Sequence, residues 1–115
     1  MYIYEMRYNL KPGADINKLS SLFDELAAPL CRKIPGFLFC NTYQCSRRSE
    51  DESPEWDYLY IEAWENKEAY DKAINDKLIG MDPDSEISKT GLPQKLLPMI
   101  DKLSSSWGTL IYSTK

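Results

Sequence analysis

The alternation of residues 2–10 (YIYEMRYNL) constrains the fold of this chain most strongly. One set of alternating positions is aromatic or apolar throughout and consists of Tyr2, Tyr4, Met6, Tyr8 and Leu10. The other set begins with Ile3 and continues with Glu5, Arg7 and Asn9. A period of two over a run of this length predicts a β-strand. The KPG turn that follows (11–13) ends it.

The remaining elements follow from periodicity and from turn residues. We expect a helix of roughly 18 residues that is capped by Asp15 and bent at Pro29, before the Pro35-Gly36 break. Downstream we expect strands over 37–45 and 56–64, a helix over 67–79, a short helix over 92–103 bent at Pro98, and a strand over 107–113. In the second strand, Phe37, Phe39, Asn41, Tyr43 and Cys45 are expected on one face. Polar loops are expected over 46–55 and 80–91.

The predicted order β-α-β-β-α-(α)-β spans residues 1–115 as a single domain. Two split βαβ units of this kind predict an α+β, ferredoxin-like fold, with helices on one face of an antiparallel four-stranded sheet. The other face also carries apolar side chains. We therefore expect a second copy of the chain to cover it, which makes the protein a homodimer.

Composition restricts the partners. The chain has 14 basic and 18 acidic residues and a net charge of −4, which argues against nucleic acid and against an anionic membrane surface. The sequence contains no apolar run of the about 18 residues needed to cross a bilayer. The N-terminal segment has the pattern of a strand rather than of a signal peptide, so we expect a cytoplasmic protein.

Metal and cofactor motifs are missing from the sequence. It contains no histidine, and its three cysteines (Cys31, Cys40 and Cys45) form no CxxC pair. A zinc site would need three thiolates with a carboxylate or water, which matches common sites poorly. We therefore expect reduced structural thiols, no metal and no cofactor. A cysteine nucleophile would lack its usual histidine partner.

Three stretches resemble a known group of proteins. IPGF (34–37) precedes the second strand, and YIEAWENKEAY (60–70) has a Glu-x-Trp pattern followed by a helix. Both are similar to the antibiotic biosynthesis monooxygenase-like family of the dimeric α/β-barrel superfamily. The LKPG turn (10–13) is also similar to the related NIPSNAP-like proteins.

The resemblance implies that two sheets face each other across a two-fold axis and form a closed barrel. It also implies a pocket in each subunit between sheet and helices. Members include cofactor-free oxygenases of aromatic quinols, haem-degrading enzymes, isomerases and proteins without known activity. The haem-degrading branch uses a histidine ligand on the second helix, and this chain has no histidine, so haem degradation is not expected.

The leading hypothesis is a cofactor-independent monooxygenase-like protein that acts on a small aromatic or polyketide-like molecule. Cofactor-free oxygenation needs a proton acceptor and donors to a developing oxyanion in a dry cavity. We assign the base to Glu62 and the aromatic walls to Trp64 and Tyr70. The expected substrate-binding residues are four tyrosines and an asparagine: Tyr4, Tyr8, Tyr58, Tyr60 and Asn41.

Two alternatives stay open. The first is a module that binds a small ligand or dimerises without catalysis, in which Trp64 and Tyr70 only pack the corner and Glu62 pairs with Arg7 or caps a backbone group. The second is an isomerase or lyase that uses Glu62 for proton transfer without oxygen. The sequence leaves open whether the 80–91 loop is a lid. It identifies neither the substrate nor assemblies beyond a dimer.

Overall fold

The computed structural model describes residues 1–46 and 55–114. Its strands are β1 (Tyr2–Leu10), β2 (Phe37–Gln44), β3 (Tyr58–Trp64) and β4 (Ile100–Thr109). Its helical segments are α1 (Ile16–Leu22), the π-helix η1 (Phe23–Ala27), α2 (Ala28–Cys31), α3 (Lys67–Asn75), α4 (Glu86–Lys89), α5 (Leu92–Leu96) and the 3-10 turn η2 (Leu97–Met99). Most of the predicted loop 46–55 lies outside the described residues.

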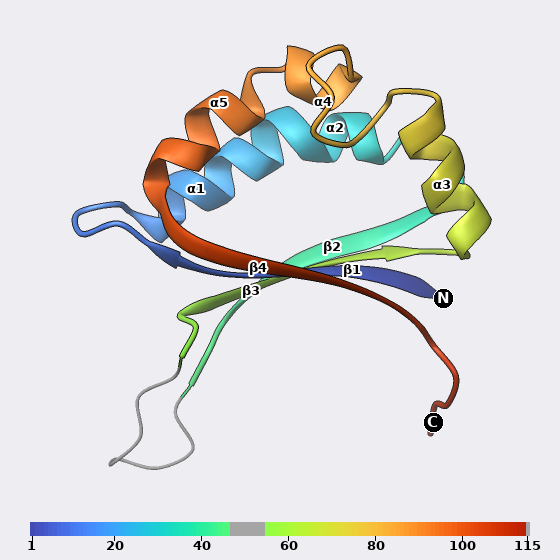
Figure 1. The fold of residues 1–115 in the computed structure, drawn as a ribbon, viewed down its shortest axis with the longest axis horizontal. Coiled ribbons are helices and arrows are strands. Elements are labelled where there is room, and N and C mark those ends of the chain that lie inside the picture. Colours follow the sequence, from blue (N-terminus) through green and yellow to red (C-terminus); the bar gives the residue numbers. More distant parts are fainter. Residues whose placement is uncertain (47–54, 115) are drawn as a thin grey trace.

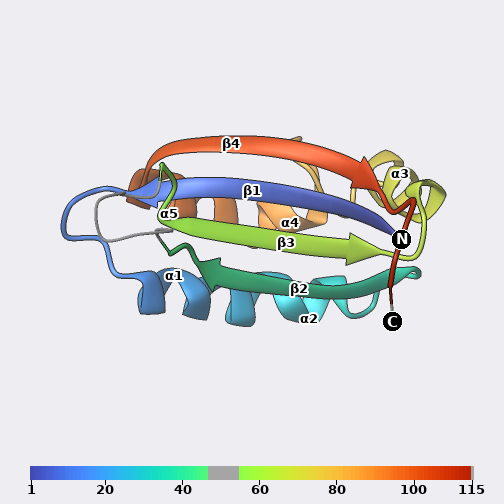
Figure 2. The same cartoon turned by 90° about the horizontal axis from the view of Figure 1, so that it is seen from below.

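The four strands form one antiparallel sheet in the order β2-β3-β1-β4. Within residues 1–46 and 55–114, all helices lie on one face of this sheet, and no helix covers the other face, called the uncovered face below (Figure 1). Seen from the uncovered side, β1 and β3 are central and β4 and β2 are the two edges (Figure 2). The predicted α+β, ferredoxin-like architecture with a four-stranded antiparallel sheet is therefore confirmed.

The first helical segment changes type ahead of Pro29. Asp15 caps α1 as predicted, and its Oδ1 accepts a hydrogen bond of 2.9 Å from the Asn17 N–H. The expected bend takes the form of the π-helix η1, in which the Ala28 N–H bonds to the Phe23 carbonyl. Pro29 has no N–H, and its ring would clash with the Glu25 carbonyl in a regular helix, so a wider turn accommodates it.

The face pattern predicted for the second strand is wrong at its start. The pairing of β2 with β3 shifts register between Phe37 and Phe39, so one residue is inserted as a bulge. Phe37 consequently lies on the helix side, where its ring meets Trp64 edge-on at 5.4 Å. Phe39 pairs with Ala63 and lies on the uncovered face instead.

The last strand was also predicted in the wrong place. β4 occupies Ile100–Thr109, whereas the sequence favoured a helix over 92–103 and a strand over 107–113. Tyr2, the first residue of β1, pairs with Thr109. One backbone hydrogen bond follows this pair, from the Leu110 N–H to the Met1 carbonyl. Ile111, in the tail after β4, is 95% exposed. Pairing along β1 outweighs the weak strand propensity of the serine-rich segment.

The second long helix ends earlier than predicted. Asn66 caps α3 through a bond of 2.8 Å from the Ala69 N–H, and the helix stops at Asn75 rather than at Ile79. Lys77 has a φ of 58°, in the left-handed region, which ends the helix and turns the chain over the sheet. Residues 77–91 then form a segment that contains the short helix α4.

Gly36 allows α3 to approach the start of β2. It has a φ of +86°, and a Cβ built there would collide with the Cβ of Ala69 on α3. Gly36→Ala is expected to lower the free energy of unfolding by about 2–3 kcal/mol, from left-handed strain plus overpacking.

Gly13→Ala is the matched control for that change. Gly13 has nearly the same φ (+85°), but a Cβ there meets nothing within 4 Å. We expect a loss of only about 1 kcal/mol. Urea denaturation of both variants measures the difference, and equal losses would show that the collision with Ala69 is relieved by a shift of α3.

Candidate functional site

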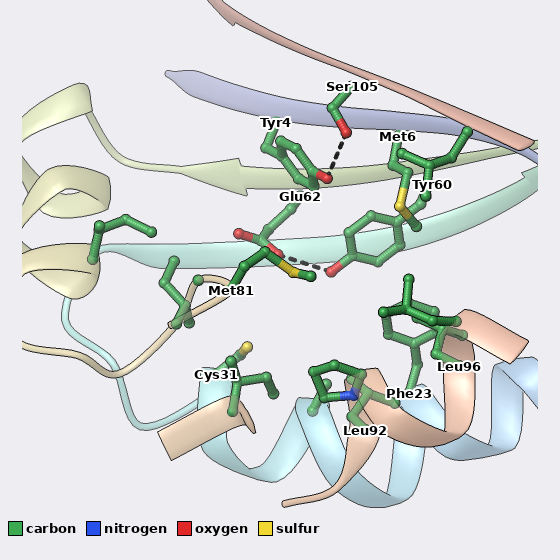
Figure 3. A pocket seen from close by; sticks show the side chains of 18 of the residues that line it. Tyr4, Met6, Phe23, Cys31, Tyr60, Glu62, Met81, Leu92, Leu96 and Ser105 are labelled. Carbon is green, nitrogen blue, oxygen red and sulfur yellow. Dashed lines mark hydrogen bonds between the residues drawn. The ribbon is translucent and has the colours of Figure 1, made fainter. Parts of the chain in front are cut away.

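A cavity of about 520 Å³ lies between the helix-covered face of the sheet and the helices. Figure 3 shows side chains of the sheet on one side of it and those of η1, α2 and α5 on the other. The apolar lining consists of Met6, Phe23, Ala27, Cys31, Ile74, Ile79, Met81, Ile87, Leu92, Pro93, Leu96, Leu97, Ile100 and Leu103. The polar lining side chains are Tyr4, Tyr60, Glu62, Tyr70, Ser105 and Trp107.

Glu62 is the single acidic residue among the described lining residues. Its Oε2 accepts a hydrogen bond of 2.9 Å from the Tyr60 hydroxyl, and its Oε1 accepts one of 2.7 Å from the Trp64 Nε1–H. All three residues lie on the same face of β3, because side chains two apart in a strand point the same way. The alternation seen in the sequence therefore builds this carboxylate and its two donors.

Burial raises the pKa of the Glu62 carboxyl above its usual value, although the hydrogen bonds from Trp64 and Tyr60 act in the opposite direction. Burial also raises the pKa of Tyr60 well above 10, and the nearby charge of Glu62 adds to this. For Cys31, burial raises the pKa to about 12, so that thiol stays protonated at neutral pH. The site thus pairs one carboxyl group of raised pKa with tyrosine hydroxyls and a thiol whose pKa values are also raised.

The raised pKa of Glu62 has a consequence for stability. Since the folded-state pKa exceeds the unfolded one, the contribution of Glu62 to stability is greatest below the usual carboxyl pKa and is lost as pH rises through the folded-state pKa. The melting temperature of the wild type minus that of Glu62→Gln is therefore expected to fall as pH rises from 4 towards 7. Thermal melts of both proteins across this range measure it, and a rising difference would contradict the raised pKa.

Four of the eight predicted site residues line the cavity: Glu62, Tyr4, Tyr60 and Tyr70. Trp64 lies behind Glu62, is fully buried, and does not line the cavity. The position predicted for it as a cavity wall is therefore not supported, and its Nε1–H bonds to the Glu62 carboxylate instead. The alternative pairing of Glu62 with Arg7 is wrong, because Arg7 lies on the uncovered face, 3.0 Å from Glu5.

The other three predicted residues lie elsewhere. Tyr8 is fully buried and stacks on Tyr58 at 5.5 Å, beyond the cavity. Asn41 lies on the uncovered face of β2 and donates to the Tyr43 hydroxyl at 3.1 Å. A direct contact between these residues and a ligand in this cavity is therefore not supported by their placement.

Sequence reasoning missed Ser105 and Trp107, which line the cavity from β4. The Ser105 hydroxyl is 2.9 Å from that of Tyr4 (Figure 3), and the Trp107 Nε1–H donates to the Tyr70 hydroxyl at 2.9 Å. Both residues alternate with the uncovered-face positions of β4. The predicted helix over 92–103 and strand over 107–113 left Ser105 between two elements, so its position on a strand face was missed.

The segment after α3 covers part of the cavity. Gly80, Met81 and Ile87 line it, and Met81 is nevertheless 73% exposed. Backbone hydrogen bonds from Glu86 to Lys77 (2.8 Å) and from Ile87 to Leu78 (3.0 Å) close the base of this loop. Its position suits a cover for the cavity, and its motion stays a prediction.

A second cleft of about 290 Å³ lies on the β2 side of the helices. Phe23 and Tyr60, stacked at 4.9 Å, contribute to both spaces. Asp24 and Arg32 line the second cleft, so it is more polar than the first. We therefore take the first cavity as the candidate site for an apolar ligand. Within the described residues, no cluster of His, Cys, Asp and Glu side chains is arranged to hold a metal ion.

Comparison with solved structures supports the fold. The chain is similar to the Arabidopsis thaliana protein At3g17210, with 14% identity and a TM-score of 0.69 over the whole of both chains. It is also similar to HapK from Hahella chejuensis, with 14% identity and a TM-score of 0.64 over 100% of this chain and 97% of HapK. A third similar structure is SnoaB, a cofactor-independent oxygenase from Streptomyces nogalater, with 15% identity and a TM-score of 0.59 over 97% of this chain and 94% of SnoaB. A DABB family protein and NIPSNAP domain proteins share the architecture.

These neighbours show that the chain has a ferredoxin-like fold, which is the fold predicted from the sequence. No protein-family model and no curated protein matches the sequence. At identities of this size, the likeness concerns the fold alone. None of the helices in the described part of the chain is long and apolar enough to cross a membrane.

Proposed function

We propose that this protein is a cofactor-independent monooxygenase-like enzyme, acting on a small aromatic or polyketide-like molecule in the cavity above the sheet. The observation that carries the proposal is Glu62, a carboxylate held by Tyr60 and Trp64 at the wall of an apolar cavity. A carboxylate with a raised pKa in such surroundings is a stronger base than one in water. The fold of SnoaB, a cofactor-independent oxygenase, is consistent with this chemistry.

In the proposed reaction, Glu62 takes a proton from a phenol or enol, and the resulting anion passes an electron to molecular oxygen. Recombination forms a carbon–oxygen bond. Loss of water then leaves one oxygen atom in the product as a carbonyl, with the other released as water. All four electrons that reduce the oxygen come from the substrate, so the chemistry needs no cofactor. The hydroxyls of Tyr4 and Tyr70 supply donors near the developing negative charge, whereas the Tyr60 hydroxyl is already donated to Glu62.

The first experiment is a native mass spectrum of the purified protein, which reports both bound small molecules and oligomeric state. Oxygen uptake with anthrone as a test substrate then examines turnover. One oxygen consumed per anthrone oxidised is expected. In air-saturated buffer, proton exchange on anthrone without oxygen consumption would favour the isomerase or lyase alternative.

One observation favours the non-catalytic alternative. Both oxygens of Glu62 already accept hydrogen bonds within the protein, which is also what a structural carboxylate needs. A binding module predicts that anthrone binds but is not consumed, and that Glu62→Gln changes neither property.

We further propose that the protein is a cytoplasmic homodimer, joined through the uncovered face of the sheet. That face carries Ile3, Leu59, Ile61, Phe39 and Tyr43, and the last two are 40% and 48% exposed. A solved neighbour from Thermobifida fusca is described as a dimeric ferredoxin-like protein. Apolar surface of this kind is stabilised when a second copy covers it.

Phe39→Glu is expected to weaken that dimer. A two-fold axis places two new carboxylates in the interface, one from each subunit. We expect this to weaken the free energy of dimerisation by about 2–4 kcal/mol. Light scattering after size-exclusion chromatography should show a shift from dimer to monomer. Ser21→Glu adds the same charge on the exposed side of α1 and should leave the dimer intact. A dimer unaffected by Phe39→Glu would place the interface elsewhere.

A further inference from the structure

The polar groups of the cavity differ in what they have left to offer a ligand. The Tyr60 O–H and the Trp64 N–H are both donated to Glu62. Tyr70 is different, because its oxygen accepts the Trp107 Nε1–H at 2.9 Å. The proton of the Tyr70 hydroxyl is therefore not required by that bond and makes no hydrogen bond to any described residue. It is available to a ligand.

Tyr70 is also held in place on several sides. Its ring lies 5.2 Å from that of Tyr2 and meets the Trp64 ring edge-on at 5.8 Å. Trp107, which anchors the hydroxyl, is 54% exposed and packs against Tyr4 at 5.4 Å. A donor fixed in this way needs little reorganisation when charge develops on a bound oxygen.

The charges of the cavity restrict the ligand further. Among the described lining residues there is no lysine or arginine, and Glu62 is the one acidic side chain. A bound carboxylate or phosphate would be desolvated next to a negative charge with no cation to offset it, so the site disfavours anions. What remains complementary is a neutral, mostly apolar molecule. It would present an acidic hydrogen to Glu62 and an acceptor oxygen to Tyr70.

We propose that the cavity enolises a neutral ketone, with Tyr70 donating its hydroxyl hydrogen bond to the carbonyl oxygen and Trp107 acting as the positioning residue for Tyr70. This inference rests on the proposed function of Glu62 as the base. Glu62 takes the proton from the carbon beside the carbonyl, and the electron pair of that C–H bond forms the enolate. The negative charge moves to the oxygen held by Tyr70. The reverse step returns the proton to carbon, so no oxidant or reductant is involved.

The acidity of Tyr70 agrees with a donor role. Burial raises the pKa of the Tyr70 hydroxyl, the Trp107 hydrogen bond lowers it, and the charges of Glu62, Tyr2 and Tyr4 raise it. The Trp107 bond thus makes the Tyr70 O–H a better donor than it would otherwise be. Removal of that bond should raise the pKa of Tyr70 further.

The test uses 1-tetralone, a neutral ketone with exchangeable protons at C2, in D₂O under argon. Proton NMR follows the replacement of these protons by deuterium. We expect the protein to accelerate exchange above the buffer rate, Tyr70→Phe to lower kcat about 10²-fold, and Trp107→Phe to lower kcat about 10-fold with little change in KM. Trp56→Phe is the matched control, since Trp56 does not line the cavity and faces Lys102 at 4.7 Å.

A readout independent of exchange separates positioning from packing. NMR titration of Tyr70, labelled with ¹³C at its ring, should show a higher pKa in Trp107→Phe than in the wild type. An unchanged pKa would overturn the positioning role. Circular dichroism confirms that each variant is folded.

The remaining outcomes distinguish this inference from the proposed function. A greater loss in Tyr4→Phe than in Tyr70→Phe would overturn the inference and transfer the donor role to the Tyr4–Ser105 pair. Absence of wild-type exchange above buffer would overturn enolisation, while anthrone oxidation still tests oxygenation. Exchange that persists in Glu62→Gln would overturn the base itself, and the proposed function with it.

Discussion

Glu62→Gln is expected to lower the turnover number by a factor of about 10²–10⁴, the usual contribution of a positioned general base. Glutamine has the shape of the glutamate side chain but cannot accept the substrate proton at neutral pH. Its oxygen can still accept the Trp64 N–H, and its amide can donate to the Tyr60 hydroxyl, so the hydrogen bonds at both ends are retained. The cavity should therefore keep its shape and bind its ligand.

Oxygen uptake with anthrone gives the rate of this variant, and denaturation gives its stability. Replacing the carboxylate weakens the hydrogen bonds that it accepts, but it also removes the desolvation cost of a buried charge. Because these two effects oppose each other, we expect the free energy of unfolding to change by no more than about 1 kcal/mol. Ligand affinity within a few-fold of wild type, together with lost turnover, would establish the base. Equal turnover in both proteins would rule that role out.

Trp64→Ala is expected to have the largest effect on stability, about 4–5 kcal/mol, from the cavity it leaves and the donor it removes. Trp64 is fully buried at the corner between β3 and α3, where it meets Phe37 and Tyr70 edge-on. A loss of this size is comparable to the whole stability of many small domains. Chemical denaturation should show a variant that is marginally folded at room temperature.

Trp64→Phe separates the packing of the ring from its hydrogen bond. It retains most of the buried ring but not the Nε1–H that bonds Glu62, so we expect a smaller loss of about 2 kcal/mol. Because that bond lowers the pKa of Glu62, its removal should raise the pKa further. The pH at which turnover reaches half of its maximum should move upward. An unchanged pH profile would show that Trp64 supports the fold alone.

Much of this molecule was predictable because local patterns agree with the tertiary fold. The alternation of β1 and of Tyr58, Tyr60, Glu62 and Trp64 on β3 identified the helix-covered face and placed the carboxylate on it. The turn at Gly36 was equally visible. Its left-handed backbone and its close approach to α3 both require glycine, so a local sequence signal carries tertiary information.

The errors arose where long-range pairing outweighs local preference. The bulge at Leu38 moved Phe39, Asn41 and Tyr43 to the uncovered face, because a one-residue insertion inverts every side chain that follows. Similarly, the serine-rich segment before Trp107 was not assigned to a strand. It forms one because β1 needs a partner along its length, and its backbone hydrogen bonds do not depend on side-chain polarity.

The sequence by itself determined the order of the elements, the sheet with helices on one face, and the choice of Glu62 as the central group. These follow from periodicity, capping residues and turns, which act over a few residues. Only the tertiary structure decided that Trp64 bonds to Glu62 without lining the cavity, that Tyr8 is in the core with Tyr58 packed against it, and that Trp107 bonds to Tyr70. The Trp107–Tyr70 bond joins residues far apart in the chain. Trp64 is only two residues from Glu62, but whether its ring lines the cavity depends on packing against α3 and the sheet, which no local pattern encodes.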